Sequence, residues 1–146
     1  MLKLATLGVV ALLVAAAPQD KKATYAVIVN AKNACTETGD KAMAIVKKLF
    51  LKQLSQWPDG TEARPYARKK GEPETDEFGK AVLGMSDAEL ARHWLKLKNM
   101  DGTTPPKEVG SDRMVLKYVA KHEGALAVVK IAEAKGEKDV KILFEF

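Results

Sequence analysis

The stretch ATYAVIVNA, residues 23–31, decides the fold of this 146-residue chain. Its centre is apolar and partly β-branched, a pattern that indicates a buried strand. A buried strand must be covered by other elements of the same chain. The segments that follow it therefore have to supply helices and further strands.

These segments alternate between helical and strand-like patterns. In the first, which Asp40 is expected to cap, apolar residues recur at helical spacing and lysines take the opposite side. Further helices are expected at about 73–83, from 86 and from 111, and further strands at about 65–69, 125–131 and 140–146. The order β-α-β-α-α-α-β-β predicts an α/β fold, in which helices flank a mixed, mostly parallel sheet.

Local signals mark the ends of these elements. The sequence PDG at 58–60 predicts a turn, because proline presets φ and glycine allows a positive φ. Gly84 is expected to close one helix, and Ser86 with Glu89 forms a capping box that starts the next. Ser111 is expected to cap the last helix. Large apolar residues on the inner faces of the helices are expected in the core: Leu49, Phe50, Phe78, Leu90, Trp94 and Leu97.

The first 17 residues have the pattern of a secretory signal peptide. Lys3 is their one charge, and the apolar run Leu4–Ala17 ends in small residues. This run is shorter than the ~20 apolar residues that span a bilayer. We therefore expect a signal peptide at residues 1–17, a mature domain at 24–146, a periplasmic or secreted location and no stable membrane anchor.

The charge and the cysteine content restrict the partners. The formal net charge of +5 falls to +4 once Lys3 leaves with the signal peptide, and the basic residues are scattered. This distribution argues against nucleic acid and is compatible with small anions. Cys35 is the single cysteine, so no internal disulfide can form. It is expected to be a small residue near a helix start, the alternatives being a reactive thiol or an intermolecular bridge.

The sequence offers no recognisable catalytic or metal-binding set. His93 and His122 are the two histidines, and neither belongs to a spaced group of ligands. The Cys-x-x-Cys, His-Glu-x-x-His, Gly-x-Ser-x-Gly and P-loop motifs are absent. Glu72 and Glu74 are close in sequence, which does not show that they converge on a substrate. We therefore expect no enzymatic activity, no metal and no cofactor.

Several short motifs occur in a characteristic order. They are AVIVN at 26–30, IVKKLFLK at 45–52, WPDG at 57–60, FGKAVLGMS at 78–86, Trp94, PP at 105–106, V-x-SD at 109–112 and VKIL at 140–143. In this order they resemble the short exported proteins related to the phosphate-binding subunit of ABC transporters, over residues 24–146. The resemblance implies a single lobe of the type II periplasmic-binding-protein fold.

The same resemblance implies a position for an anion site. In full-length relatives one lobe supplies an arginine, followed three residues later by Gly-Ser-Gly-Thr at a helix start, where amides, hydroxyls and a guanidinium suit an oxyanion. Counting back from Phe78 puts Arg68 in the arginine position and Gly71 on the first glycine. Together with Thr75, these are the ligand-binding residues that the resemblance implies.

Three expected donor positions are instead occupied by Glu72, Pro73 and Glu74. Proline has no amide hydrogen, and the acidic side chains either repel an anion or simply suit the helix dipole. A lone lobe also leaves a small ion open to water, where its interactions are screened. Two functions follow. The chain is either an exported solute-binding-like protein that binds phosphate or another small anion weakly, or a ligand-free module that docks on an envelope partner. Forming a homodimer is another way for a lone lobe to complete its site.

Overall fold

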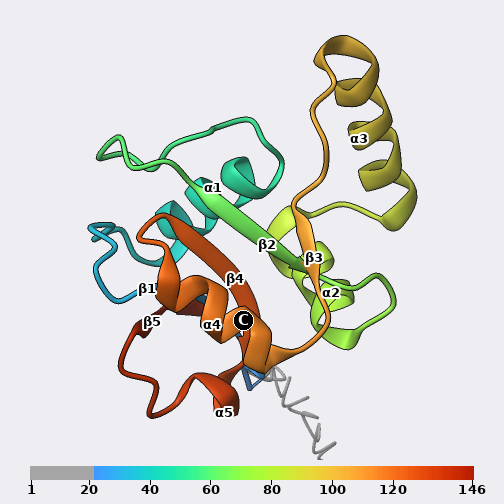
Figure 1. The fold of residues 1–146 in the computed structure, drawn as a ribbon. Coiled ribbons are helices and arrows are strands. Elements are labelled where there is room, and N and C mark those ends of the chain that lie inside the picture. Colours follow the sequence, from blue (N-terminus) through green and yellow to red (C-terminus); the bar gives the residue numbers. More distant parts are fainter. Residues whose placement is uncertain (1–21) are drawn as a thin grey trace, which may run out of the picture.

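A computed structural model describes residues 22–146 of the chain (Figure 1). The expected signal peptide, residues 1–17, lies outside the described residues. Within residues 22–146, no helix is both long enough and apolar enough to cross a membrane. This part of the chain forms a sheet with apolar clusters on both of its faces.

The sheet of the described residues has five strands in the order β3-β2-β4-β1-β5. Their bounds are Tyr25–Asn30 (β1), Arg64–Arg68 (β2), Lys107–Val109 (β3), Ala125–Lys130 (β4) and Val140–Glu145 (β5). β2 runs parallel to β3 and β4, whereas β1 runs antiparallel to β4 and β5. The expected mixed sheet is confirmed. Its parallel pairs lie on the β3 side, and the β5 side is antiparallel because β1 is inserted in the opposite direction between β4 and β5.

The helices follow the expected plan, with one short addition, α5. Their bounds are Gly39–Phe50 (α1), Pro73–Phe78 (α2), Gly79–Leu83 (η1), Asp87–Asp101 (α3), Asp112–Lys121 (α4) and Ile131–Ala134 (α5). η1 is a π-helical turn that continues α2, so the two fill the helix expected at 73–83. β3 and α5 were not expected, because such short segments show no period. The N-cap of α1 is Thr38, and Asp40 lies in the first turn instead of capping the helix as expected.

β1 is buried on both faces of the sheet, as its sequence predicts. Val27 and Val29 belong to the apolar cluster that includes side chains of α1, α2 and η1. Ile28 belongs to the cluster on the other face, with Val115 and Val119 of α4. Figure 1 shows α4 lying across β4 on one face of the sheet and α1 on the other. Because successive strand residues point to opposite faces, one apolar strand contributes to both layers of the core.

The predicted helix signals are confirmed at atomic detail. Oγ of Ser86 accepts a hydrogen bond from the amide of Glu89 at 3.2 Å, and the Glu89 carboxylate accepts one from the Ser86 amide at 2.9 Å. Oγ of Ser111 accepts from the Met114 amide at 3.3 Å. Gly84 closes η1 with a φ of 62°, a conformation that glycine adopts without strain.

α3 projects from the rest of the protein, and its apolar residues are the part of the expected core that was wrong. Leu49, Phe50 and Phe78 are buried, but Leu90, Trp94 and Leu97 of α3 are only partly buried. Figure 1 shows α3 standing beyond the sheet, and of its expected core residues Leu90 and Trp94 pack against the apolar cluster that includes side chains of α1, α2 and η1. Next to Trp94, Nε2 of His93 lies 2.8 Å from the carbonyl oxygen of Leu51, which ties the helix to the body.

Phe78 is the side chain through which α2 reaches the core, so its truncation tests this packing. Its ring lies 4.6 Å from the ring of Phe50 and 5.9 Å from that of Phe146, between centroids. We expect Phe78→Ala to lower the free energy of unfolding by about 3–5 kcal/mol, measured in urea. Phe144→Ala, on a half-buried ring of β5, is the control and should cost less. A loss below about 1 kcal/mol for Phe78→Ala would show that α2 does not pack as described.

Candidate functional site

Arg68 ends β2 and is buried, with 8% of its surface exposed. Its Nε and Nη2 donate hydrogen bonds to Oε2 of Glu72 at 3.1 and 2.9 Å, and its Nη1 donates to Oδ1 of Asp112. Glu72 is the N-cap position of α2 and Asp112 is the first residue of α4. Two carboxylates of the chain itself therefore use three of the five N–H donors that a guanidinium can offer to an oxyanion.

Gly71 and Thr75 support the turn that brings Glu72 back to Arg68. Gly71 has a φ of 88°, and the carbonyl oxygen of Lys69 accepts hydrogen bonds from the Glu72 amide at 3.2 Å and from Oγ1 of Thr75 at 2.7 Å. The hydroxyl proton of Thr75 is therefore already used within the protein. Of the three residues that the resemblance implied, Arg68 and Thr75 line one cleft, and Gly71 lies in the turn beside it.

Glu74 adds a third acidic group near Arg68, after Glu72 and Asp112. Its side chain is 6% exposed, and Nζ of Lys130 lies 4.0 Å from its Oε1. Burial raises the pKa of Asp112, the positive charge of Arg68 lowers it, and the negative charge of Glu74 raises it further, for a net rise. The surroundings of Arg68 therefore hold more negative charge than one guanidinium compensates.

An apolar cleft of about 250 Å³ lies beside these groups. Its walls come mainly from β2, α2, η1, α3 and the Pro-Pro loop, with one aromatic ring from α1. The apolar residues that line it include Phe50, Phe78, Leu83, Leu90, Trp94 and Pro106, and the charged ones are Arg68, Lys70, Glu74, Asp87 and Glu108. A concave, mostly apolar space with a few charged groups is the usual form of a small-molecule site.

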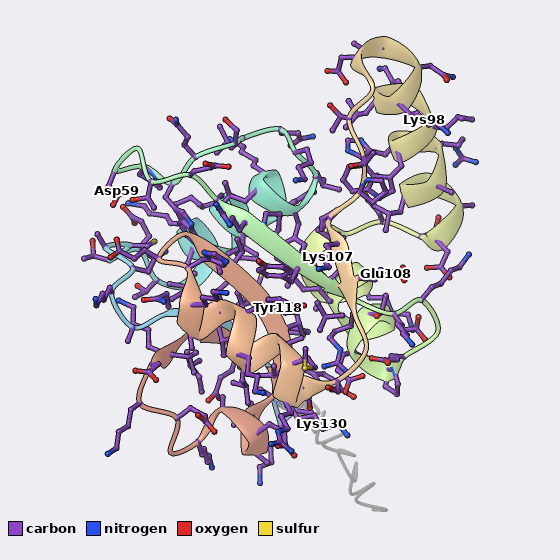
Figure 2. The ribbon with its side chains drawn as sticks, viewed as in Figure 1. Asp59, Lys98, Lys107, Glu108, Tyr118 and Lys130 are labelled. Atoms are coloured by element: carbon purple, nitrogen blue, oxygen red, sulfur yellow. The ribbon has the colours of Figure 1, made fainter. Side chains whose placement is uncertain are left out.

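β3 determines which charges reach the cleft. Successive strand residues point to opposite faces, so Lys107 and Glu108 separate. Nζ of Lys107 lies 5.0 Å from the centroid of the Tyr118 ring on α4, whereas Glu108 lines the cleft. Figure 2 shows Tyr118 on α4 and Glu108 on the side of α2. A lysine is thereby directed away from the cleft and a carboxylate toward it.

The two histidines take part in contacts elsewhere in the fold. His93 bonds the carbonyl oxygen of Leu51, and both ring nitrogens of His122 lie 3.4 Å from Nη1 of Arg64. Within residues 22–146, no group of three or more histidine, cysteine, aspartate or glutamate side chains could hold a metal ion.

Asp112 is the residue of this candidate site that the sequence did not reveal. It lies 44 residues from Arg68 along the chain, and the closeness of the two depends on the packing of α4 beside β2. The motif V-x-SD at 109–112 contained it, but as part of a helix start. The apolar cleft was also not foreseen, because α3 was expected to be in the core.

The structure has the fold of a single periplasmic-binding-protein-like lobe. The class of protein to which it is similar is the phosphate ABC transporter substrate-binding proteins. No protein-family model matches the sequence, and no curated protein matches it. The likeness to solved structures therefore shows the fold.

Three of these solved structures illustrate the match. An ABC-type phosphate transport receptor from Vibrio cholerae aligns with a TM-score of 0.61 at 16% identity, over 83% of this chain and 45% of that chain. PstS from Borrelia burgdorferi aligns with a TM-score of 0.59 at 11% identity, over 83% and 46%. A Clostridium perfringens protein, described as a phosphate ABC transporter substrate-binding protein with bound phosphate, aligns with a TM-score of 0.56 at 13% identity, over 82% and 53%. This chain thus spans about half the length of the structures it matches.

Proposed function

We propose that this chain is an exported solute-binding-like protein whose ligand site is the cleft beside Arg68. The fold shared with phosphate transport receptors supports a solute-binding role, and the apolar run Leu4–Ala17 supports export to the periplasm or beyond. We further propose that Arg68, Gly71 and Thr75 are the residues toward which phosphate or another small anion would bind, and that the protein is not an enzyme.

The pairing of Arg68 with Glu72 and Asp112 is the observation that carries this proposal, because it determines how strongly an anion binds. To reach the guanidinium, an anion must displace carboxylates that are already bonded to it at 2.9–3.1 Å on the Glu72 side. It must also approach Glu74, which is buried nearby. Both requirements reduce affinity, so phosphate is expected to bind weakly.

A thermal-shift titration with inorganic phosphate tests this expectation. A ligand at about 100 times its dissociation constant stabilises a fold by about 2.7 kcal/mol, so weak binding predicts an unchanged melting temperature at millimolar phosphate. The double variant Glu72→Ser with Glu74→Thr removes both acidic groups and should show a rise in melting temperature. Adding Arg68→Ala to it is the control that should abolish the rise.

Two other outcomes would contradict weak phosphate binding at Arg68. A clear rise at micromolar phosphate in the unmodified protein, lost in Arg68→Ala, would show that transport-type binding survives. If the double variant also fails to respond, Arg68 is a structural residue. The second candidate function, a module that docks on an envelope partner or a second copy, would then gain support. The observation that favours that candidate is α3, which carries no fully buried residue.

A further inference from the structure

The charges that line the cleft favour a positively charged ligand. Three carboxylates line it, from Glu74, Asp87 and Glu108, against the cations of Arg68 and Lys70. Arg68 is already compensated by Glu72 and Asp112, and Lys130 lies 4.0 Å from Glu74. Lys70, Asp87 and Glu108 are all exposed to solvent, so Glu74 is the uncompensated lining charge that is buried. The remaining balance is negative, and a low-dielectric wall strengthens the field of such charges inside a cleft.

Glu74 provides a second, independent observation. The Glu74 side chain is only 6% exposed. Within residues 22–146, no group donates a hydrogen bond to its carboxylate, and its ion partner is Lys130 at 4.0 Å. No fully buried side-chain oxygen in this part of the chain lacks a hydrogen-bond partner. The oxygens of Glu74 therefore keep a small exposed area, and the residue is one of those that line the cleft. A nearly buried carboxylate without a hydrogen-bond donor is costly, and a ligand that brings one removes that cost.

The apolar part of the cleft suits the rest of such a ligand. Aromatic rings of Phe50, Phe78 and Trp94 line it. Such rings bury apolar surface well and also attract an ammonium group through the negative faces of their π-systems. An inorganic cation has no apolar surface to bury against these walls, and an anion would meet Glu74.

We infer that the cleft binds a small organic amine, in which an ammonium group bonds the carboxylate of Glu74 and an apolar, preferably aromatic, body lies among the aromatic side chains. This inference rests on the proposed function in one respect, that the cleft is a solute site. It assigns to that site a ligand of opposite charge to the one bound in the Clostridium perfringens structure.

Calorimetric titration with three probes of similar shape tests the inference. Phenethylamine is the cation, phenethyl alcohol is its neutral analogue and phenylacetate is the anion. We expect phenethylamine to bind at least about tenfold more tightly than phenethyl alcohol, since a charge-assisted hydrogen bond replaces a neutral one. Phenylacetate should bind more weakly than either.

Single-residue variants test which side chains bind the amine. Glu74→Gln should lower phenethylamine affinity about tenfold and leave phenethyl alcohol unchanged. Glu123→Gln makes the same chemical change on an exposed residue beyond the far end of α4 and is the matched control, with no expected effect. Trp94→Ala should weaken the binding of both ligands, because it removes an aromatic ring of α3 that lines the cleft. Should Glu74→Gln fail to fold by circular dichroism, Glu108→Lys on the exposed edge strand replaces it and should weaken phenethylamine several-fold with phenethyl alcohol unchanged.

The outcomes separate the two proposals. If none of the three probes binds, the cleft is not a site for such solutes, and both the inference and the proposed location of the site fail. If phenethyl alcohol binds as tightly as phenethylamine, the site stands and the inferred charge of its ligand is wrong. If Glu74→Gln retains the amine preference, Glu74 is not the group that bonds the ammonium, and the inference is overturned.

Discussion

Replacing Arg68 with alanine is expected to lower the free energy of unfolding by about 3–5 kcal/mol at neutral pH. The substitution removes the guanidinium that lies between the carboxylates of Glu72 and Asp112. It leaves these two carboxylates and that of Glu74 close together. Unpaired charges in a poorly hydrated site cost more than the pair itself contributed. Urea unfolding at neutral pH measures the loss.

The pH dependence of this loss identifies its cause. Burial already raises the pKa of Asp112, and removal of the Arg68 charge raises it further. A carboxyl group whose pKa is higher in the folded state stabilises the fold below its unfolded pKa of about 3.9, and this contribution is lost as the pH rises through the folded pKa. The difference in stability between Arg68→Ala and the unmodified protein should therefore be largest at neutral pH and shrink on acidification.

Arg64→Ala is the matched control, because Arg64 lies on the same strand with an exposed side chain. Its effect should stay within about 0.5 kcal/mol, as for ordinary surface positions. A loss below about 1 kcal/mol for Arg68→Ala, or a loss that does not change with pH, would show that this arginine does not hold the carboxylates of Glu72 and Asp112 together.

Gly124→Ala is expected to cost more than about 3 kcal/mol, beyond the usual range for overpacking, or to prevent folding. A Cβ at this position would lie 1.7 Å from the carbonyl oxygen of Glu62, which is backbone and cannot rotate away. The carbonyl oxygen of Gly124 also accepts hydrogen bonds at 2.9 Å from Nε1 of Trp57 and from the amide of Arg64. Any shift that relieved the clash would strain these bonds. Thermal and urea unfolding measure the effect.

Gly79→Ala is the control for this substitution. A Cβ at Gly79 would meet its nearest neighbour, the carbonyl oxygen of Met85, at 3.6 Å, which is ordinary contact. Alanine also favours helical backbone over glycine by about 1 kcal/mol, so this variant should be as stable as the unmodified protein or slightly more so. Equal stability of the two alanine variants would mean that the 62–64 segment does not approach Gly124 as described.

The short-range features of this protein were predictable because each depends on neighbours in the chain. The apolar centre of β1, the capping box of Ser86 and Glu89, the cap at Ser111 and the closing glycine at Gly84 all have local physical causes. The order of the motifs also implied the lobe that the solved structures show. The misplaced cap of α1 has a local reason too, since Thr38 and Asp40 are both acceptable N-cap residues.

Long-range arrangement was decided by the tertiary structure. The apolar stripe of α3 predicts burial, but whether anything covers Leu90, Trp94 and Leu97 depends on where the loops direct the helix. The sequence showed acidic residues where an anion site was expected, but it could not show that Glu72 and Asp112 both bond Arg68. That pairing requires α2 and α4 to start on either side of the end of β2. Local sequence thus determined the longer elements, most of their caps and the buried strand. The exposed α3, the cleft and the charge inside it depend on contacts between residues far apart in the chain, which no local pattern encodes.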